Sequence, residues 1–107
     1  PWFPPAGWRN VKGLGLTLDP SHYVCGPHSR RSTSKLMKYV FHVHLRDSTK
    51  DALQVRIGQG EIEYGRLINQ LRKVHYNRAL SVHLDTLPDV DHTGEMRKMR
   101  LLLESLL

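Results

Sequence analysis

The sequence predicts an α/β fold with parallel strands, best described as a partial (β/α)₈ TIM barrel of about three C-terminal βα units. Three short segments alternate apolar and polar residues, segments with helical apolar spacing lie between and after them, and strands and helices alternate along the chain. This order is typical of parallel strands joined by right-handed crossovers. Each strand has one aliphatic and one mixed face, whereas a sheet covered on both sides has two apolar faces. A mixed inner face favours a barrel, whose inward side chains line the active site at the C-terminal rim.

The composition is that of one globular domain. The chain has 107 residues, of which 39% are hydrophobic and 24% charged. Apolar runs fall short of the roughly 20 residues of a membrane span, and the start of the chain lacks the pattern of a secretory signal. The single cysteine, Cys25, cannot form an internal disulfide. We therefore expect a cytoplasmic protein with no membrane partner, in which residues 1–12 are an irregular lead-in and residues 13–107 form the barrel segment.

Strands are predicted over residues 13–19, 40–46 and 79–85. In the second strand one face is expected to carry Phe41, Val43 and Leu45, and the other Val40, His42, His44 and Arg46. A complete barrel takes roughly 250 residues, so the chain has room for only part of one. Three parallel strands leave two open edges, which favours self-association or pairing with the rest of a larger protein.

Two amphipathic helices are predicted over residues 61–74 and 93–107. Their apolar stripes consist of Tyr64, Leu67, Ile68, Leu71 and Val74 in the first, and of Met96, Met99, Leu103 and Leu106 in the second. Glu61 and Glu63 are expected in the first turn of the first helix, where the helix dipole favours acids. A short helix is predicted from the Ser32–Ser34 cluster to about Lys38, while residues 20–31 and 48–60 read as loops.

The net charge of +6 is concentrated in the first half of the chain. Residues 1–50 hold eight Lys or Arg and two acids, whereas residues 51–107 hold eight of each. Between Pro20 and Arg46 there is no acid, and the basic residues there are Arg30, Arg31, Lys35, Lys38 and Arg46. Such a stretch attracts nucleic acid or a phosphorylated small molecule, unless it is simply a solvated basic loop.

Three polar residues fall at or near the C-terminal ends of the strands: Asp19, His44 and His83. By alternation all three lie on the mixed face. A carboxylate and two imidazoles at one rim are a reasonable set of ligands for a divalent metal. His22 is a fourth candidate just past the first strand, and His42, one pleat below His44, is expected to orient a neighbouring group.

Four motifs occur in an order that is familiar from one enzyme superfamily. They are Leu18-Asp19-Pro20-Ser21-His22, Phe41-His42-Val43-His44-Leu45-Arg46-Asp47, Ile57-Gly58-Gln59-Gly60-Glu61-Ile62 and Ala79-Leu80-Ser81-Val82-His83. Over about residues 13–107 the chain resembles the C-terminal part of xylose-isomerase-like TIM barrels, specifically sugar phosphate isomerases/epimerases. The resemblance implies a divalent metal (Mn, Mg, Zn or Co) held by Asp19 and His44, and a phosphorylated sugar or other small anionic ligand contacted by His22 and Arg46.

The chain departs from this family at both proton-transfer groups. In the family two glutamates move a proton at the carbon next to the sugar carbonyl. One of them would precede Pro1, and His83 stands in place of the other, where it can bind metal but does not supply a carboxylate. We therefore expect an isomerase-like chain that is incomplete or inactive alone, and whether it is an enzyme stays open.

Two other functions remain open. One is a non-catalytic basic interaction or nucleic-acid-binding module, although no aromatic residues are interleaved around Arg30 and Arg31 as in dedicated single-strand binders, which makes a nucleic-acid partner the weaker expectation. The other is a degenerate fragment with no function of its own.

Overall fold

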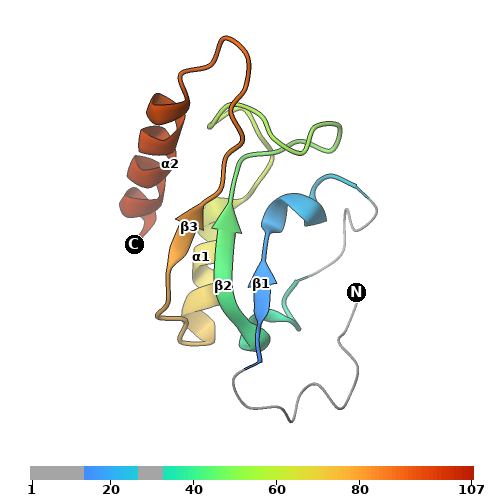
Figure 1. The fold of residues 1–107 in the computed structure, drawn as a ribbon. Helices are drawn as coiled ribbons and strands as arrows, with labels where there is room; N and C mark the ends of the chain where they lie inside the picture. The colour runs from blue at the N-terminus through green and yellow to red at the C-terminus, as the bar shows by residue number, and fades with distance from the viewer. Residues whose placement is uncertain (1–13, 27–32) are drawn as a thin grey trace.

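The chain folds around one open, three-stranded parallel sheet (Figure 1). The structure, a computed structural model, describes residues 14–26 and 33–107; the predicted lead-in, Arg30, Arg31 and Ser32 lie outside the described residues. The strands β1 (Leu16–Leu18), β2 (Val40–Leu45) and β3 (Leu80–Val82) pair in that order, each parallel to the next. The predicted α/β class and parallel sheet are confirmed. Over the described residues the sheet is open, with β1 and β3 at its edges.

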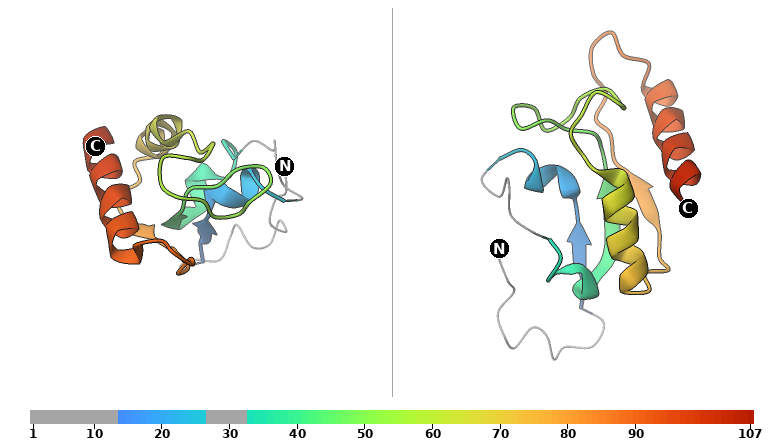
Figure 2. Two further views of the ribbon diagram at one scale, coloured as in Figure 1. Left: turned by 90° about the horizontal axis from the view of Figure 1, so that it is seen from above. Right: turned by 180° about the vertical axis from the view of Figure 1, so that it is seen from behind.

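Two α-helices follow the second and third strands. Helix α1 (Tyr64–Lys73) packs across one face of the sheet, and α2 (His92–Leu106) runs alongside β3 (Figure 2). The two shorter 3-10 helices are η2 (Pro20–Tyr23) and η3 (Met37–Tyr39). Within residues 14–26 and 33–107, no helix covers the face of the sheet that is toward the viewer in Figure 1. The sheet is thus covered on one side, as the mixed faces of its strands predict.

The hydrophobic core lies between the sheet and the two helices. Its buried members are Leu18, Met37, Val40, Val43, Leu45, Tyr64, Leu67, Leu71, Met99 and Leu103. The apolar stripe predicted for the first helix is confirmed. In α2 the stripe is only partly buried, because Met99 is 0% exposed whereas Met96 is 41% exposed.

The predicted faces of β2 are wrong at its first two residues. Val40 is buried in the core, and Phe41 is exposed. The reason is a register shift between β1 and β2: Leu16 pairs with Val40, but Thr17 pairs with His42. Phe41 is the extra residue of a β-bulge, and such a residue interrupts the alternation of side chains.

The helix boundaries also differ from the predicted ones. Helix α1 begins at Tyr64, so Glu61 and Glu63 precede its first turn. Glu61 instead belongs to the connection from β2: its backbone N–H donates to the carbonyl of Ser48, and its carboxylate accepts from the backbone N–H of Lys50. Residues near Lys38 form the 3-10 helix η3 rather than an α-helix, and η2 lies within the predicted loop 20–31.

A buried carboxylate shapes the connection from β2 to α1. Asp47 is 1% exposed and accepts hydrogen bonds from the backbone N–H groups of Ser48 (3.2 Å), Gly58 (2.8 Å) and Gly60 (3.0 Å). Gly58 has φ +94°, a backbone conformation that residues other than glycine rarely adopt. The Gly-Gln-Gly motif is therefore a turn wrapped around one carboxylate.

None of the described helices is both long and apolar enough to cross a bilayer.

Candidate functional site

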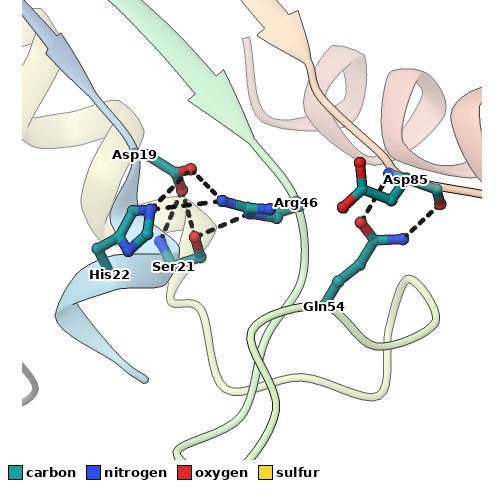
Figure 3. A network of polar contacts seen from close by, with 6 residues as sticks. All are labelled: Asp19, Ser21, His22, Arg46, Gln54 and Asp85. Carbon is teal, nitrogen blue, oxygen red and sulfur yellow. Dashed lines mark hydrogen bonds and ion pairs between the residues drawn. The ribbon is translucent and has the colours of Figure 1, made fainter. Parts of the chain in front are cut away.

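The C-terminal ends of β1 and β2 carry a compact polar cluster (Figure 3). Asp19 directly follows β1, and Arg46 directly follows β2. The Arg46 guanidinium donates from Nη2 to Asp19 Oδ2 at 2.9 Å and from Nε to Ser21 Oγ at 3.0 Å. Arg46 is only 8% exposed and Ser21 is fully buried. A buried cation requires such a partner, because an unpaired charge out of water is strongly unfavourable.

Asp19 also organises the turn that follows β1. Its Oδ1 accepts the backbone N–H of Ser21 at 3.1 Å, which caps η2, and it accepts the Ser21 hydroxyl as well. Proline at the first position of η2 suits this geometry, since its missing N–H would have no partner there. Asp19, Ser21 and Arg46 thus form one hydrogen-bonded unit that fixes the first strand end against the second.

His22 lies at the solvent side of this cluster. Its Nε2 is 3.4 Å from Arg46 Nη2 and 3.7 Å from Asp19 Oδ2, and its side chain is 52% exposed. A guanidinium can only donate, so a hydrogen bond at 3.4 Å requires Nε2 to accept and the other ring nitrogen to carry the proton. His22 therefore has an N–H donor to offer to a ligand, as the predicted substrate contact requires.

Three imidazoles gather on the uncovered face of the sheet. His44 stacks on His83 with ring centroids 5.0 Å apart and planes 6° apart, and His42 meets His44 edge-on at 4.7 Å. His83 extends the ladder past β3, since its backbone N–H donates to the carbonyl of Leu45 at 2.9 Å. The structure therefore brings together His44 and His83, as the sequence predicts, with His42 beside them.

The predicted metal ligands are not assembled as a metal site. Among the residues that the structure describes, no three His, Cys, Asp or Glu side chains are placed to hold a metal ion. Asp19 is engaged by Arg46, and a stacked pair such as His44 and His83 does not aim its nitrogen lone pairs at one point. A divalent metal therefore does not fit this arrangement of Asp19, His44 and His83.

A second polar contact ties the connection from β2 to the segment after β3. The Gln54 side chain donates from Nε2 to the carbonyl of Asp85 and accepts its backbone N–H at Oε1, both at 2.8 Å (Figure 3). A side-chain amide here pairs with the backbone as a neighbouring strand would. Glu95, at the start of α2, similarly accepts the backbone N–H of Ile57 at 2.6 Å.

Sequence reasoning missed several of these polar residues. Ser21, Asp47, Gln54 and Glu95 all hold loops at the C-terminal edge of the sheet. Asp47 had a visible signal, because it ends the His-Leu-Arg-Asp motif and precedes two closely spaced glycines. Gln54 and Glu95 had none, since their partners are backbone groups 31 and 38 positions away.

Comparison with known proteins adds one distant relative. The chain is 25% identical over 91 residues to the uncharacterized protein MJ1311 of Methanocaldococcus jannaschii. The match covers 81% of this chain but 31% of the relative, so the chain spans about a third of that protein's length. No family model and no solved structure matches.

Proposed function

We propose that this chain is part of a sugar phosphate isomerase/epimerase-like barrel, that its uncovered polar face lines the site for a small phosphorylated ligand, and that the chain alone does not catalyse. The single observation that carries the proposal is the one-sided sheet. Its helix side is apolar, while the other side and the C-terminal edge hold the imidazoles of His42, His44 and His83 and the Asp19–Arg46 cluster.

The one-sided sheet is what a segment of a barrel requires. Inward-facing positions of parallel strands line the interior of such a fold, and functional side chains sit at the C-terminal ends of its strands. In the part of the chain that the structure describes, β1 and β3 are the edge strands, and the edges of a sheet can pair with further strands. A relative about three times as long is consistent with a larger fold, and self-association of the chain is the other way to cover these edges.

The chemistry of the polar face suits an anion. The Asp19 carboxylate is already paired with Arg46, which leaves the ring N–H groups of the imidazoles to face a ligand. His22 is the foremost of these, because it is exposed and held in orientation by Arg46. Arg46 acts by fixing His22 and the turn after β1, with its own guanidinium engaged by Asp19 and Ser21.

The same pairing argues against catalysis by the chain alone. Proton transfer beside a carbonyl needs a base within hydrogen-bond reach of the proton, with a pKa matched to the task. Asp19 is committed to Arg46, and imidazole occupies position 83 where the resemblance implies a glutamate. A metal forms no part of this proposal, because the described residues do not assemble a site for one.

The test combines binding and activity. A ketose phosphate should bind the purified chain saturably, and His22→Ala should weaken binding several-fold, whereas His75→Asn, at an exposed residue with φ 57° that asparagine tolerates, should not. Neither protein should epimerise the sugar, with or without Mn²⁺. Robust epimerisation by the chain, or equal binding by the His22→Ala variant, would contradict the proposal.

The nucleic-acid alternative has less support. Arg46, the last cation of the basic stretch, is buried and paired, and is therefore not presented to a phosphate backbone. DNA binding that weakens steeply with salt, as release of counterions requires, is the result that would favour this alternative.

A further inference from the structure

We infer that the groove between α1, β3 and α2 binds an anionic amphiphile, namely a free fatty acid. This inference goes beyond the proposed function and does not depend on it, because the groove lies on the helix side of the sheet. There Leu80 and Val82 pack against the core, whereas His83 stacks on His44 at the other face.

The groove is large and apolar. Its volume is about 710 Å³, and small-molecule sites in proteins measure roughly 300–1,000 Å³. Its apolar walls are Ile68 and Leu71 of α1, Leu80 and Val82 of β3, and Met96 and Leu103 of α2. In Figure 2, α2 stands beside β3 and α1 lies behind the sheet, and all three elements contribute lining residues. Three elements therefore line an open groove with room for one hydrocarbon chain.

The charges around the groove select for an anion. Four arginines line it, Arg72, Arg78, Arg97 and Arg100, against the side-chain carboxylate of Glu104 and the α-carboxylate that Leu107 carries in the chain as tested. Glu104 is already paired with Arg100 at 2.8 Å. Arg72 donates to the neutral carbonyl of Leu106, and Arg78 lies 4.8 Å from the Phe41 ring. Three guanidinium charges thus lack a side-chain carboxylate partner among the lining residues.

A fatty acid combines the two properties that the groove offers. Its acyl chain removes apolar side chains from water, and Met96, now 41% exposed, would be covered by it. Its carboxylate matches the fork of an arginine, which binds carboxylates through two parallel hydrogen bonds. A neutral or cationic amphiphile would fill the same space but would not form the carboxylate–arginine hydrogen bonds.

The test is calorimetric titration of the chain with decanoate and dodecanoate, kept below the concentrations at which they form micelles. We expect saturable binding to one site, with dodecanoate tighter by roughly fifteenfold, since it has two more CH₂ groups and each buried CH₂ strengthens binding about fourfold. Dodecyltrimethylammonium should bind at least tenfold more weakly. Absence of saturable dodecanoate binding, or equal affinity for the cationic analogue, would overturn the inference.

Two matched variants of α2 locate the site. Met96→Glu places a negative charge on the groove wall and should weaken dodecanoate binding at least tenfold. Leu101→Glu makes the same change on the same helix, at a residue that is 59% exposed and outside the groove lining, and should bind as the wild type does. Equal effects of the two variants would overturn the inference. So would light scattering that shows a dimer which Met96→Glu dissociates, because a second copy would then be the occupant.

Discussion

Arg46 Nη2 lies 2.9 Å from Asp19 Oδ2, which joins two residues 27 positions apart at the ends of neighbouring parallel strands. Both side chains are largely buried, at 9% and 14% exposure. This ion pair holds the turn after β1 against the end of β2 and orients His22. The position of His22 at the candidate ligand-binding edge therefore depends on the Asp19–Arg46 ion pair, which also stabilises the fold.

Breaking this pair should destabilise the fold strongly. Arg46→Ala leaves the Asp19 carboxylate without its cation, and such a loss in a buried pair costs about 3 kcal/mol or more. Chemical denaturation should show that drop in the free energy of unfolding. The exposed pair Arg100–Glu104 is the control, since a solvent-screened ion pair contributes little and Arg100→Ala should cost far less. Similar costs for the two variants would show that Arg46 is not held as described.

The turn around Asp47 should not accept a side chain at position 60. A Cβ at Gly60 would lie 1.9 Å from Asp47 Oδ1 and 2.7 Å from the backbone nitrogen of Ser48. Gly60→Ala should therefore lower the free energy of unfolding by about 2 kcal/mol. Gly65→Ala, on α1 with open space around it, should instead raise it by up to about 1 kcal/mol through helix propensity. If Gly60→Ala left the free energy of unfolding unchanged, the Asp47 carboxylate would not hold this turn.

Glu95 should make stability depend on acidic pH. The hydrogen bond from the Ile57 backbone N–H, with help from Lys98 and Arg56, lowers the pKa of Glu95 below its ordinary value of 4.5. The unfolded chain then binds this proton first, so the free energy of unfolding falls as the pH drops below about 4.5. Glu95→Gln should remove this part of the pH dependence, whereas Glu63→Gln, at an exposed residue, should leave it in place.

Tyr64 should have the corresponding effect in alkali. Burial, and then the charge of Asp47, raises the pKa of its hydroxyl above the ordinary 10.0. The unfolded chain ionises first, so this residue's contribution to stability is complete below pH 10 and is lost as the pH rises above it. Denaturation between about pH 9 and 11.5 should therefore show a smaller decline for Tyr64→Phe than for the wild type. Parallel declines would contradict the buried, neutral hydroxyl.

Periodicity predicted the parts of the fold that depend on local pattern. The strands, their parallel order and the apolar stripe of α1 follow from alternation and helical spacing. The burial of Val40 in place of Phe41 could not be predicted, because alternation assumes a regular ladder and the pairing of Leu16 and Thr17 with β2 contains a bulge. Whether a barrel closes around this sheet depends on strands outside these elements.

The sequence predicted which residues lie at the candidate site, but not which of them contact one another. Strand ends placed Asp19, His44, His83 and Arg46 at one edge, and the structure brings His44 to His83. Asp19 was predicted as a metal ligand, yet it pairs with Arg46. The pairing of this carboxylate with a guanidinium depends on the distance between two strand ends, which the spacing of residues along the chain does not contain.

The most direct test of the account is a side-chain NMR titration of the histidines with a ketose phosphate. We predict saturable shifts of the imidazole signals of His22, His44 and His83, with His75 and His92 unchanged. No saturable shift at these three imidazoles, or shifts spread equally over all histidines, would contradict the claim that the uncovered face and its C-terminal edge form the ligand site.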